Sequence, residues 1–279
     1  MLSFVVAAAG AVFSYMTAVF LVALLKKDNS IVDVAWGPGF ILVALVTFFL
    51  RPGYKARHVL IGVLVVVWGV RLATHIYLRN RGRGEDFRYA KWRKGWGRWL
   101  IPRSFLQVFM LQGIFMLIIS SPIVIVNRSS ERGLTTRDAL GALLWLTGFL
   151  FEAVGDHQLK KFKQKPESQG RIMAAGLWKY TRHPNYFGEA ALWWGIFLIA
   201  LSVRGGWVAI ISPLTIGFLL LKVSGVTMLE KKYAGSVEFA SYARRTSAFF
   251  PWFPKKPKKT LDKPIYMSYL WHREHKILC

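Results

Sequence analysis

The sequence predicts an all-α fold: a polytopic membrane protein built as a seven-transmembrane-helix bundle with an amphipathic C-terminal cytoplasmic segment. Three observations lead to this fold class. Of the 279 residues 54% are hydrophobic, the apolar runs are too long for a soluble core, and basic residues gather in alternate loops. A helix needs ~20 apolar residues to cross ~30 Å of hydrocarbon. Seven runs approach that length, at residues 2–25, 31–50, 58–78, 105–126, 139–159, 185–203 and 207–229.

The charge distribution predicts the orientation of this bundle. With seven spans and the N-terminus outside, the loops and tail on one side carry 29 Lys and Arg, and those on the other side carry 7. Because positive residues are retained on the cytoplasmic side, we expect a multi-pass integral membrane protein with its N-terminus outside and its C-terminus in the cytoplasm. The basic side chains behind the net charge of +24 then meet anionic lipid headgroups at the cytoplasmic face. Nucleic acid is therefore not needed as a partner to explain this charge.

The chain is expected to form one helical membrane domain, residues 1–254, followed by a polybasic cytoplasmic tail, residues 255–279. The single cysteine, Cys279, has no intramolecular partner for a disulfide. No paired Cys/His spacing indicates a zinc site, so no metal is predicted. The sequence leaves the oligomeric state open.

The first two spans differ in regularity. Residues 2–25 lack a preceding basic segment and read as an uncleaved helix. The second span begins IVDVAWGPGF, whose Gly-Pro-Gly break suits backbone that lines a cavity or packs on a neighbour. Asp33 near its start is either a carboxylate at headgroup level or a proton donor in a site, and we favour the first.

The third span ends WGVRLATHIYLRNRGRGEDFRY. Arg71, His75 and Arg79 recur every four residues and therefore form one cationic stripe. An arginine as deep as Arg71 needs a partner, a water-filled pocket or an anionic ligand. The following KWRKGWGRWLIPR interleaves cations and tryptophans, which predicts an interfacial belt before the fourth span at residues 105–126.

The fifth span ends FEAVGDHQLKKFKQK, where Glu152, Asp156 and Lys160 again lie four residues apart on one face. An intrahelical pair between Asp156 and Lys160 is the simplest explanation. Two carboxylates that enter the bilayer are nevertheless costly unless a cation or a hydrogen-bond donor meets them. This face is therefore a second candidate for a site.

The sixth span follows GLWKYTRHPNYFGE. Proline suits the first turn of a helix, so a helix is expected to start near Pro184. Its free amides, with Arg182 and His183, would form an anion site. Asn185 and Glu189 lie four residues apart, on one face of this helix. After the seventh span, residues 207–229, a helix is expected to lie on the membrane.

The stretch GLWKYTRHPNYFGE resembles the C-terminal signature of the steroid 5-alpha-reductase family, in particular its bacterial branch, which implies a bacterial inner membrane as the location. Those are multi-pass membrane enzymes that reduce a carbon–carbon double bond with NADPH. The turn NRGR at residues 80–83 resembles a turn of the same family that contributes to NADPH binding. A shorter part, RHPNYFG followed by WW, is similar to the isoprenylcysteine carboxyl methyltransferases, which bind S-adenosylmethionine.

The charge pattern and this resemblance together predict an NADPH site. Guanidinium groups match phosphate geometry, which suits Arg71, Arg81, Arg83, Arg171, Arg182 and Arg245 to the phosphates. Asp156, Asn185 and Glu189 would hold ribose, amide or adenine donors. The predicted set is completed by Asn80, Lys160, Tyr180, His183, Tyr186 and Tyr242.

Reduction of a double bond conjugated to a carbonyl places negative charge on the carbonyl oxygen, which a neutral acid must stabilise. The reductase family uses a glutamate and a tyrosine in its N-terminal half. Here the tyrosine's position falls near Trp68, and the second and third spans hold no matching glutamate. We name Asp33, His75 and Tyr77 as candidates instead, which leaves open whether the lipophilic substrate is a steroid or another lipid.

Two other functions remain open from the sequence. An S-adenosylmethionine-dependent integral-membrane methyltransferase would use the Asp156 and Glu189 carboxylates for the ribose. A non-enzymatic lipid-binding protein would bind neither cofactor. We favour the reductase because the signature ending at Glu189 follows Asp156 and Arg171 at reductase-like spacing.

Overall fold

The computed structural model describes residues 2–50, 53, 55–131, 133–223, 225–233 and 235–256. Within these ranges all regular structure is helical, apart from an isolated bridge between Thr181 and Ser247. The predicted all-α class is therefore confirmed. The predicted polybasic tail, from residue 257 onward, lies outside the described residues.

Six helical stretches of the described chain are long and apolar enough to cross a membrane. They are α1 (Leu2–Lys26), α2 (Ile31–Phe49), α3 (Ala56–Asn80), the run Phe87–Ile119, α8 (Thr136–Gln164) and the run Gly206–Lys231. The last run contains α10 (Ile211–Phe218) and continues into α11 (Val226–Lys232). The sixth predicted span is α9 (Pro184–Ala200), whose 17 residues are shorter than those six. The predicted number of seven spans is therefore not confirmed.

The fourth predicted span, residues 105–126, is not one straight helix. The chain forms α4 (Phe87–Trp96), α5 (Leu100–Arg103), a π-helical stretch (Ser104–Met110) and α6 (Leu111–Ile119). The helix is interrupted at Ser120, and a new helix, α7 (Ser121–Arg128), starts with Pro122 in its first turn. Proline has no amide hydrogen to continue the preceding helix, but it fits the first turn of a new one.

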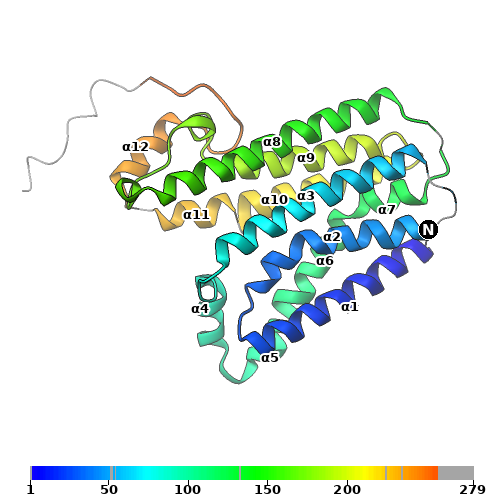
Figure 1. The fold of residues 1–279 in the computed structure, drawn as a ribbon, viewed down its shortest axis with the longest axis horizontal. Coiled ribbons are helices and arrows are strands. Elements are labelled where there is room, and N and C mark those ends of the chain that lie inside the picture. Colours follow the sequence, from blue (N-terminus) through cyan, green and yellow to red (C-terminus); the bar gives the residue numbers. More distant parts are fainter. Residues whose placement is uncertain are drawn as a thin grey trace, which may run out of the picture.

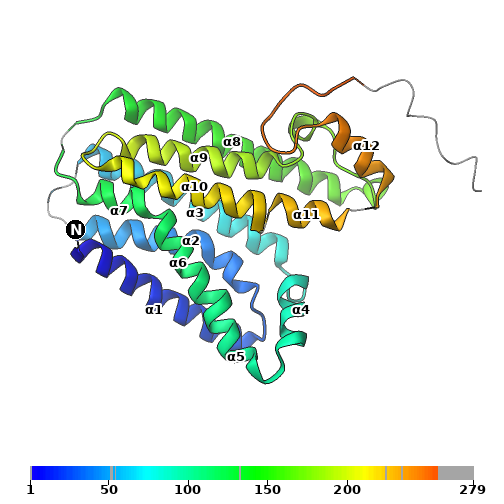
Figure 2. The same ribbon diagram turned by 180° about the vertical axis from the view of Figure 1, so that it is seen from behind.

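Helices α8 and α9 run side by side along the molecule, next to α3 and α10 (Figures 1 and 2). Glycines at the contact allow their backbones to approach closely. A Cβ atom added at Gly148 would lie 2.5 Å from the carbonyl oxygen of Gly188, and one added at Gly141 would lie 2.6 Å from that of Gly195. Small residues at helix contacts are typical of membrane bundles. Most of α9 is buried as a result.

We expect Gly188→Ala to destabilise the bundle by about 1–3 kcal/mol, because the new methyl group would force α8 and α9 apart. Thermal unfolding of the purified protein in detergent measures this effect. The matched control is Gly217→Ala on α10, where an added Cβ meets no atom within 4 Å. Equal unfolding temperatures for both variants would contradict the close packing.

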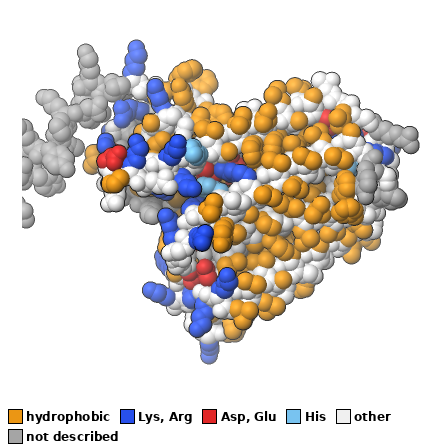
Figure 3. All heavy atoms as spheres, in the orientation of Figure 1, with side chains coloured by type: hydrophobic (Ala, Val, Ile, Leu, Met, Phe, Trp, Pro, Cys, Tyr) orange, Lys and Arg blue, Asp and Glu red, His pale blue; other side chains and the backbone are white. Residues whose placement is uncertain are grey.

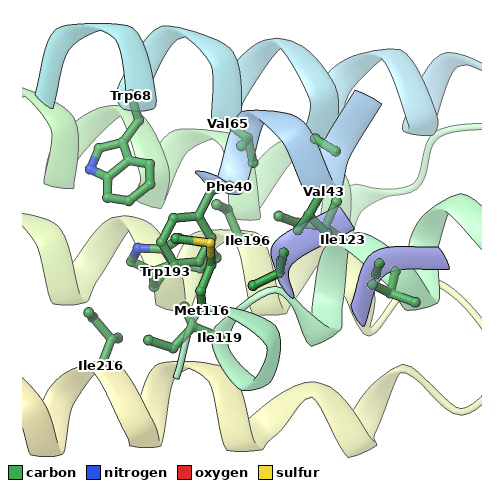
Figure 4. Packing of buried hydrophobic residues seen from close by; sticks show 14 of the residues in the cluster. Phe40, Val43, Val65, Trp68, Met116, Ile119, Ile123, Trp193, Ile196 and Ile216 are labelled. Atoms are coloured by element: carbon green, nitrogen blue, oxygen red, sulfur yellow. The ribbon is translucent and has the colours of Figure 1, made fainter. Parts of the chain in front are cut away.

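An aromatic core joins the two halves of the chain (Figure 4). The rings of Phe40, Trp68 and Trp193 come from α2, α3 and α9, and their centroids lie 5.0–5.4 Å apart. Trp68 and Trp193 are fully buried. Such contacts between tilted rings add to the free energy gained from burial. This core therefore sets the spacing between the helices that carry the candidate site.

The surface has two distinct regions. Hydrophobic side chains cover the length of the bundle, and Lys and Arg gather at the end that holds α4 and α12 (Val237–Arg245) (Figure 3). An apolar belt with a charged end suits a protein whose sides face lipid. At the opposite end α3 and α8 begin together, because Arg57 Nε donates to Asp138 Oδ1 at 2.8 Å.

Candidate functional site

The site is centred on Arg71, in the second half of α3. Its Nη1 atom lies 2.5 Å from Glu152 Oε1, and its Nη2 atom donates to Asp156 Oδ2 and to the carbonyl oxygen of Glu152. Glu152 and Asp156 come from one face of α8 and are 2% and 8% exposed. The half-buried Arg71, for which the sequence named no partner, therefore has two carboxylate partners.

Further donors surround these carboxylates. Trp68 Nε1 donates to Glu152 Oε2 at 3.2 Å, and Asn185 Nδ2 donates to Asp156 Oδ1 at 3.1 Å. His75 Nε2 lies 3.5 Å from Asp156 Oδ2. Glu189, one turn along α9 from Asn185, is within electrostatic range of Asp156 and Arg71. Residues from α3, α8 and α9, up to 121 positions apart in sequence, thus converge.

A cavity of about 340 Å³ opens beside this cluster, between α3 and α8. Its volume falls in the lower part of the range of small-molecule sites. Figure 3 shows acidic, basic and histidine side chains together where the bundle meets its charged end. The lining residues are Arg71, Thr74, His75, Leu78, Ala153, Asp156, His157 and Lys160.

Asp33 belongs to a second polar network. Its Oδ2 atom lies 2.6 Å from Arg88 Nη2, and its Oδ1 atom accepts a hydrogen bond of 2.6 Å from the Tyr89 hydroxyl. Gln112 Nε2 contacts the same hydroxyl at 3.4 Å. Asp33 is therefore bound to α4, and Tyr89 is only 3% exposed. The sequence pattern did not single out Arg88 and Tyr89 as site residues, although they lie in EDFRY, which directly follows the NRGRG turn.

Asp86, just before α4, explains how this helix starts. Its Oδ1 atom accepts hydrogen bonds from the backbone amide and the Nε of Arg88, at 3.0 and 2.8 Å. Burial raises the pKa of this carboxyl, but the hydrogen bonds and charge of Arg88 outweigh burial, so the pKa is lowered overall. An aspartate that caps the first turn in this way holds the helix start in place. Arg88 is thereby directed at Asp33.

Tyr186 on α9 connects the two networks electrostatically. Glu189 and Asp156 act on it from one side of the site, and Arg79 and Arg88 also lie within range. Its ring stacks on His183, with the centroids 5.5 Å apart. Tyr186 therefore lies within electrostatic range of Asp156 and of Arg88, the partner of Asp33.

The NRGR turn ends α3 at the charged end. The backbone amide of Arg81 donates to the carbonyl of Tyr77, and that of Arg83 donates to the carbonyl of Asn80. Gly82 has a φ of +76°, which a residue with a side chain rarely adopts. The side chains of Arg81 and Arg83 are exposed. Tyr77 is 54% exposed and is not among the residues that line the cavity.

Arg182 holds the C-terminal segment against the bundle. Its Nε lies 2.8 Å from Glu230 Oε1, and its Nη1 donates to the carbonyls of Ala243 and Thr246 at 2.9 and 2.8 Å. Its backbone amide donates to the carbonyl of Ser247. The guanidinium of this predicted phosphate ligand thus already binds Glu230 and two carbonyl groups.

His183 and Tyr242 take part in the same junction. Tyr242 donates to the carbonyl of Trp178, whose indole in turn donates to the carbonyl of Gly155 at 3.1 Å. His183 Nε2 lies 3.2 Å from Glu230 Oε1. Burial lowers the pKa of His183, and the hydrogen bond to Glu230 opposes this only in part.

The remaining predicted residues lie near the rim. Lys160 lines the cavity, whereas Arg171, Tyr180 and Arg245 are exposed. The loop that carries Arg171 is tied to α12, because the amide of Ile172 donates to Glu238 Oε1 at 3.1 Å. Arg245 Nε contacts the carbonyl of Ser241 in its own helix at 3.4 Å. The rim residues are thus less closely gathered than those around Arg71.

Comparison with known proteins identifies relatives. A family described as "Protein of unknown function (DUF1295)" matches residues 19–246. An uncharacterized protein of Schizosaccharomyces pombe is 26% identical over 203 residues, which cover 63% of this chain and 59% of the yeast protein. No solved structure matches the chain.

The chain also resembles enzymes named 3-oxo-5-alpha-steroid 4-dehydrogenase 1 over a shorter stretch. The human protein is 38% identical over 69 residues, and the bovine protein is 37% identical over 65 residues. These matches cover 25% and 23% of this chain, and 27% and 25% of the two enzymes. The similarity thus spans about a quarter of the length of these enzymes.

Proposed function

We propose that this chain, which belongs to the family described as "Protein of unknown function (DUF1295)", is an NADPH-dependent membrane reductase. Its substrate would be a steroid-like or other lipophilic compound with a carbon–carbon double bond conjugated to a carbonyl. The partial similarity to enzymes named 3-oxo-5-alpha-steroid 4-dehydrogenase 1 supports the reaction class.

One observation carries the proposal. Two segments that the sequence singled out separately line one cavity, with Arg71 and His75 from α3 and Asp156 and Lys160 from α8. A third segment meets them there, because Asn185 from α9 donates to Asp156. The donor set fits a dinucleotide. Asn185 Oδ1 is buried without a hydrogen-bond partner among the described residues, so it can accept a bond from a ligand.

When bound, NADPH would supply the hydride. Asp156 and Asn185 would orient the nicotinamide and its ribose, and the exposed Arg81, Arg83 and Lys160 would bind the phosphates at the charged end. The Tyr89 hydroxyl carries a proton and donates a hydrogen bond to Asp33. This pair and His75 are the groups that could supply a proton to the substrate. Packed aromatic rings below the cluster would exclude water.

A lipophilic substrate would reach the site from the bilayer. A second cavity, of about 320 Å³, lies between α1 and α2 and is lined mainly by apolar side chains. Its polar group, the Tyr15 hydroxyl, donates to the carbonyl of Ala35 at 2.8 Å. The lining residues are Tyr15, Ala18, Val19, Val22, Ile31, Val34, Ala35 and Pro38.

The proposed topology follows from the same charge distribution. The charged end with α4 and α12 would face the cytoplasm of a bacterium, where NADPH is available and anionic lipid headgroups meet the exposed cations. The buried helix α9 would be the seventh helix, shielded from lipid by its neighbours. The C-terminal helix α12 would lie at the membrane surface.

We expect NADPH to raise the unfolding temperature of the detergent-purified protein more than NADH or S-adenosylmethionine does, because a ligand stabilises the folded state that binds it. A shift with S-adenosylmethionine alone would favour the methyltransferase, for which the Asp156 and Glu189 carboxylates could hold a ribose. No shift with any of the three would favour the lipid-binding protein.

Arg171→Ala should weaken NADPH binding by about tenfold and leave NADH binding nearly unchanged, because only NADPH carries the 2'-phosphate that a guanidinium would bind. Titration calorimetry with both cofactors measures this difference. Arg204→Ala, at the opposite end of the bundle, is the control and should bind both cofactors as the wild type does. Equal losses for NADPH and NADH in Arg171→Ala would exclude this phosphate assignment.

A further inference from the structure

The chain after α12 contains an exposed aromatic segment, FFPWFP at residues 249–254. Its rings point away from the protein: Phe250, Trp252 and Phe253 are 70%, 72% and 79% exposed. In Figure 1 this segment follows α12, in orange, and loops toward α8. Large apolar rings gathered at one exposed place are typical of a surface that binds a partner or enters a membrane.

Backbone hydrogen bonds hold the aromatic segment in place. The amide of Trp252 donates to the carbonyl of Tyr180 at 2.9 Å. The Thr181 hydroxyl donates to the carbonyl of Phe249 at 2.8 Å. Both partners belong to the loop that leads into α9. The exposed rings are therefore carried on a fixed backbone that is bonded to the bundle.

Ring contacts place the aromatic segment beside the apolar part of the bundle. Phe151 of α8 packs on Phe187 of α9, with the ring centroids 5.2 Å apart. The Phe187 ring in turn lies 6.1 Å from the rings of Phe249 and Phe250. Phe151 lies 13 residues before Gln164, the last residue of α8, or about 20 Å along the helix axis. The segment is therefore continuous with the hydrophobic sides of the bundle.

Basic side chains flank the aromatic segment on both sides. Lys179 Nζ lies 6.0 Å from the centroid of the Tyr180 ring, and that ring lies 6.1 Å from the ring of Phe253. On the other side, the amide of Lys255 donates to the carbonyl of Arg245 at 2.9 Å. The exposed cations there are Arg244, Arg245, Lys255 and Lys256. Figure 3 shows hydrophobic side chains next to Lys and Arg in this part of the charged end.

We propose that the aromatic segment inserts into the membrane leaflet at the charged end and binds anionic lipid headgroups through its flanking cations. Rings that continue the hydrophobic sides of the bundle fit a lipid surface, where aromatic side chains lie at headgroup depth. The flanking cations fit a negatively charged surface. This inference rests on the proposed position of the charged end at the membrane surface and not on the proposed reaction.

The inserted segment also acts on the loop before α9. Its backbone is bonded to Tyr180 and Thr181, and the next residues of that loop are Arg182 and His183. Anionic lipid that holds the segment therefore holds this loop as well.

The first test places an environment-sensitive fluorophore on single cysteines of the full chain in nanodiscs of phosphatidylglycerol. Cys279→Ser removes the one cysteine of the sequence, and Phe250→Cys or Trp252→Cys then carries the label. Both side chains are exposed, so these changes leave the packing intact. We expect emission at shorter wavelengths, quenched by brominated lipids and not by aqueous iodide. Glu167→Cys, in the exposed turn after α8, is the control and should be quenched by iodide.

The second test changes the headgroup and the cations. Brominated phosphatidylglycerol should quench the labels more strongly than brominated phosphatidylcholine. Each cation near an anionic surface changes the ratio of inserted to free segment by about fivefold. Lys255→Gln with Lys256→Gln should therefore reduce the difference between the two lipids. Lys91→Gln with Lys94→Gln removes the same charge from exposed positions on α4 and should keep it.

The outcomes decide the inference. Labels at positions 250 and 252 that iodide quenches would show a segment that faces water, and would overturn it. Labels that neither quencher reaches would show that protein covers the rings, which also overturns it. Equal quenching by the two brominated lipids would exclude anionic headgroups as the partner. All three outcomes leave the reductase function in place, because the binding of NADPH tests that function separately.

Discussion

Replacement of Arg71 by methionine should abolish cofactor-dependent reduction and destabilise the bundle strongly. The change removes the only guanidinium bound to both Glu152 and Asp156 in the described part of the chain. Breaking a buried ion pair costs about 3–5 kcal/mol, because the remaining charge has no partner. Both carboxylates would then lose their cationic partner, and Asp156 would no longer be held in the geometry that orients a ligand.

The unfolding temperature and the consumption of NADPH should therefore both fall in Arg71→Met. A matched variant separates the two effects. Arg71→Met combined with Glu152→Gln and Asp156→Asn carries no unpaired charge at these positions, so most of the stability should return. Cofactor binding should stay absent in that triple variant. An Arg71→Met protein that is as stable as the wild type and binds cofactor would contradict the role of this ion cluster.

The second large effect is expected from Arg182→Met, which should release the C-terminal segment from the bundle. Arg182 is bonded to Glu230 on α11 and to two carbonyls at the end of α12. Its loss leaves two carbonyl groups without this donor and leaves Glu230 with His183 alone, at about 1–3 kcal/mol for each buried group. Because the same segment covers the start of α9, cofactor affinity should fall as well.

Limited proteolysis in detergent measures this release, with cleavage expected between α11 and α12 and around residues 246–253. Arg244→Met is the control, because Arg244 lies on α12, the helix whose end Arg182 binds, but is exposed. Its cleavage pattern should match that of the wild type. An Arg182→Met protein that resists cleavage as the wild type does, but binds NADPH more weakly, would indicate instead that the guanidinium acts directly on the cofactor, as the sequence suggested.

The stripes of the site could be predicted because helical periodicity is local. Residues four apart share a face, so Arg71 with His75, and Glu152 with Asp156, are recognisable without any tertiary information. The cost of charge at bilayer depth further indicated that each stripe needs a partner. The structure brings these two stripes together through the ion pairs of Arg71.

Contacts between distant helices could not be predicted in this way. The bond between Asp33 and Tyr89 joins residues 56 positions apart, and it depends on the path of α4 after the NRGR turn. The use of Arg182 also depends on a distant segment, because its carbonyl acceptors at Ala243 and Thr246 lie more than 60 residues further along the chain. A basic residue beside a helix start suggests an anion site. No residue close to Arg182 in the sequence indicates that carbonyl groups bind its guanidinium instead.

The sequence by itself determined that the chain forms apolar helices with a strongly basic end, since burial of apolar length and local periodicity are properties of each segment alone. Only the tertiary structure decided which charges meet. It paired Arg71 with Glu152 and Asp156, interrupted the helix at Ser120, and placed α9 inside the bundle. The physical reason is that an ion pair or a glycine contact depends on the distance between two helices, which is set by the packing of all the others.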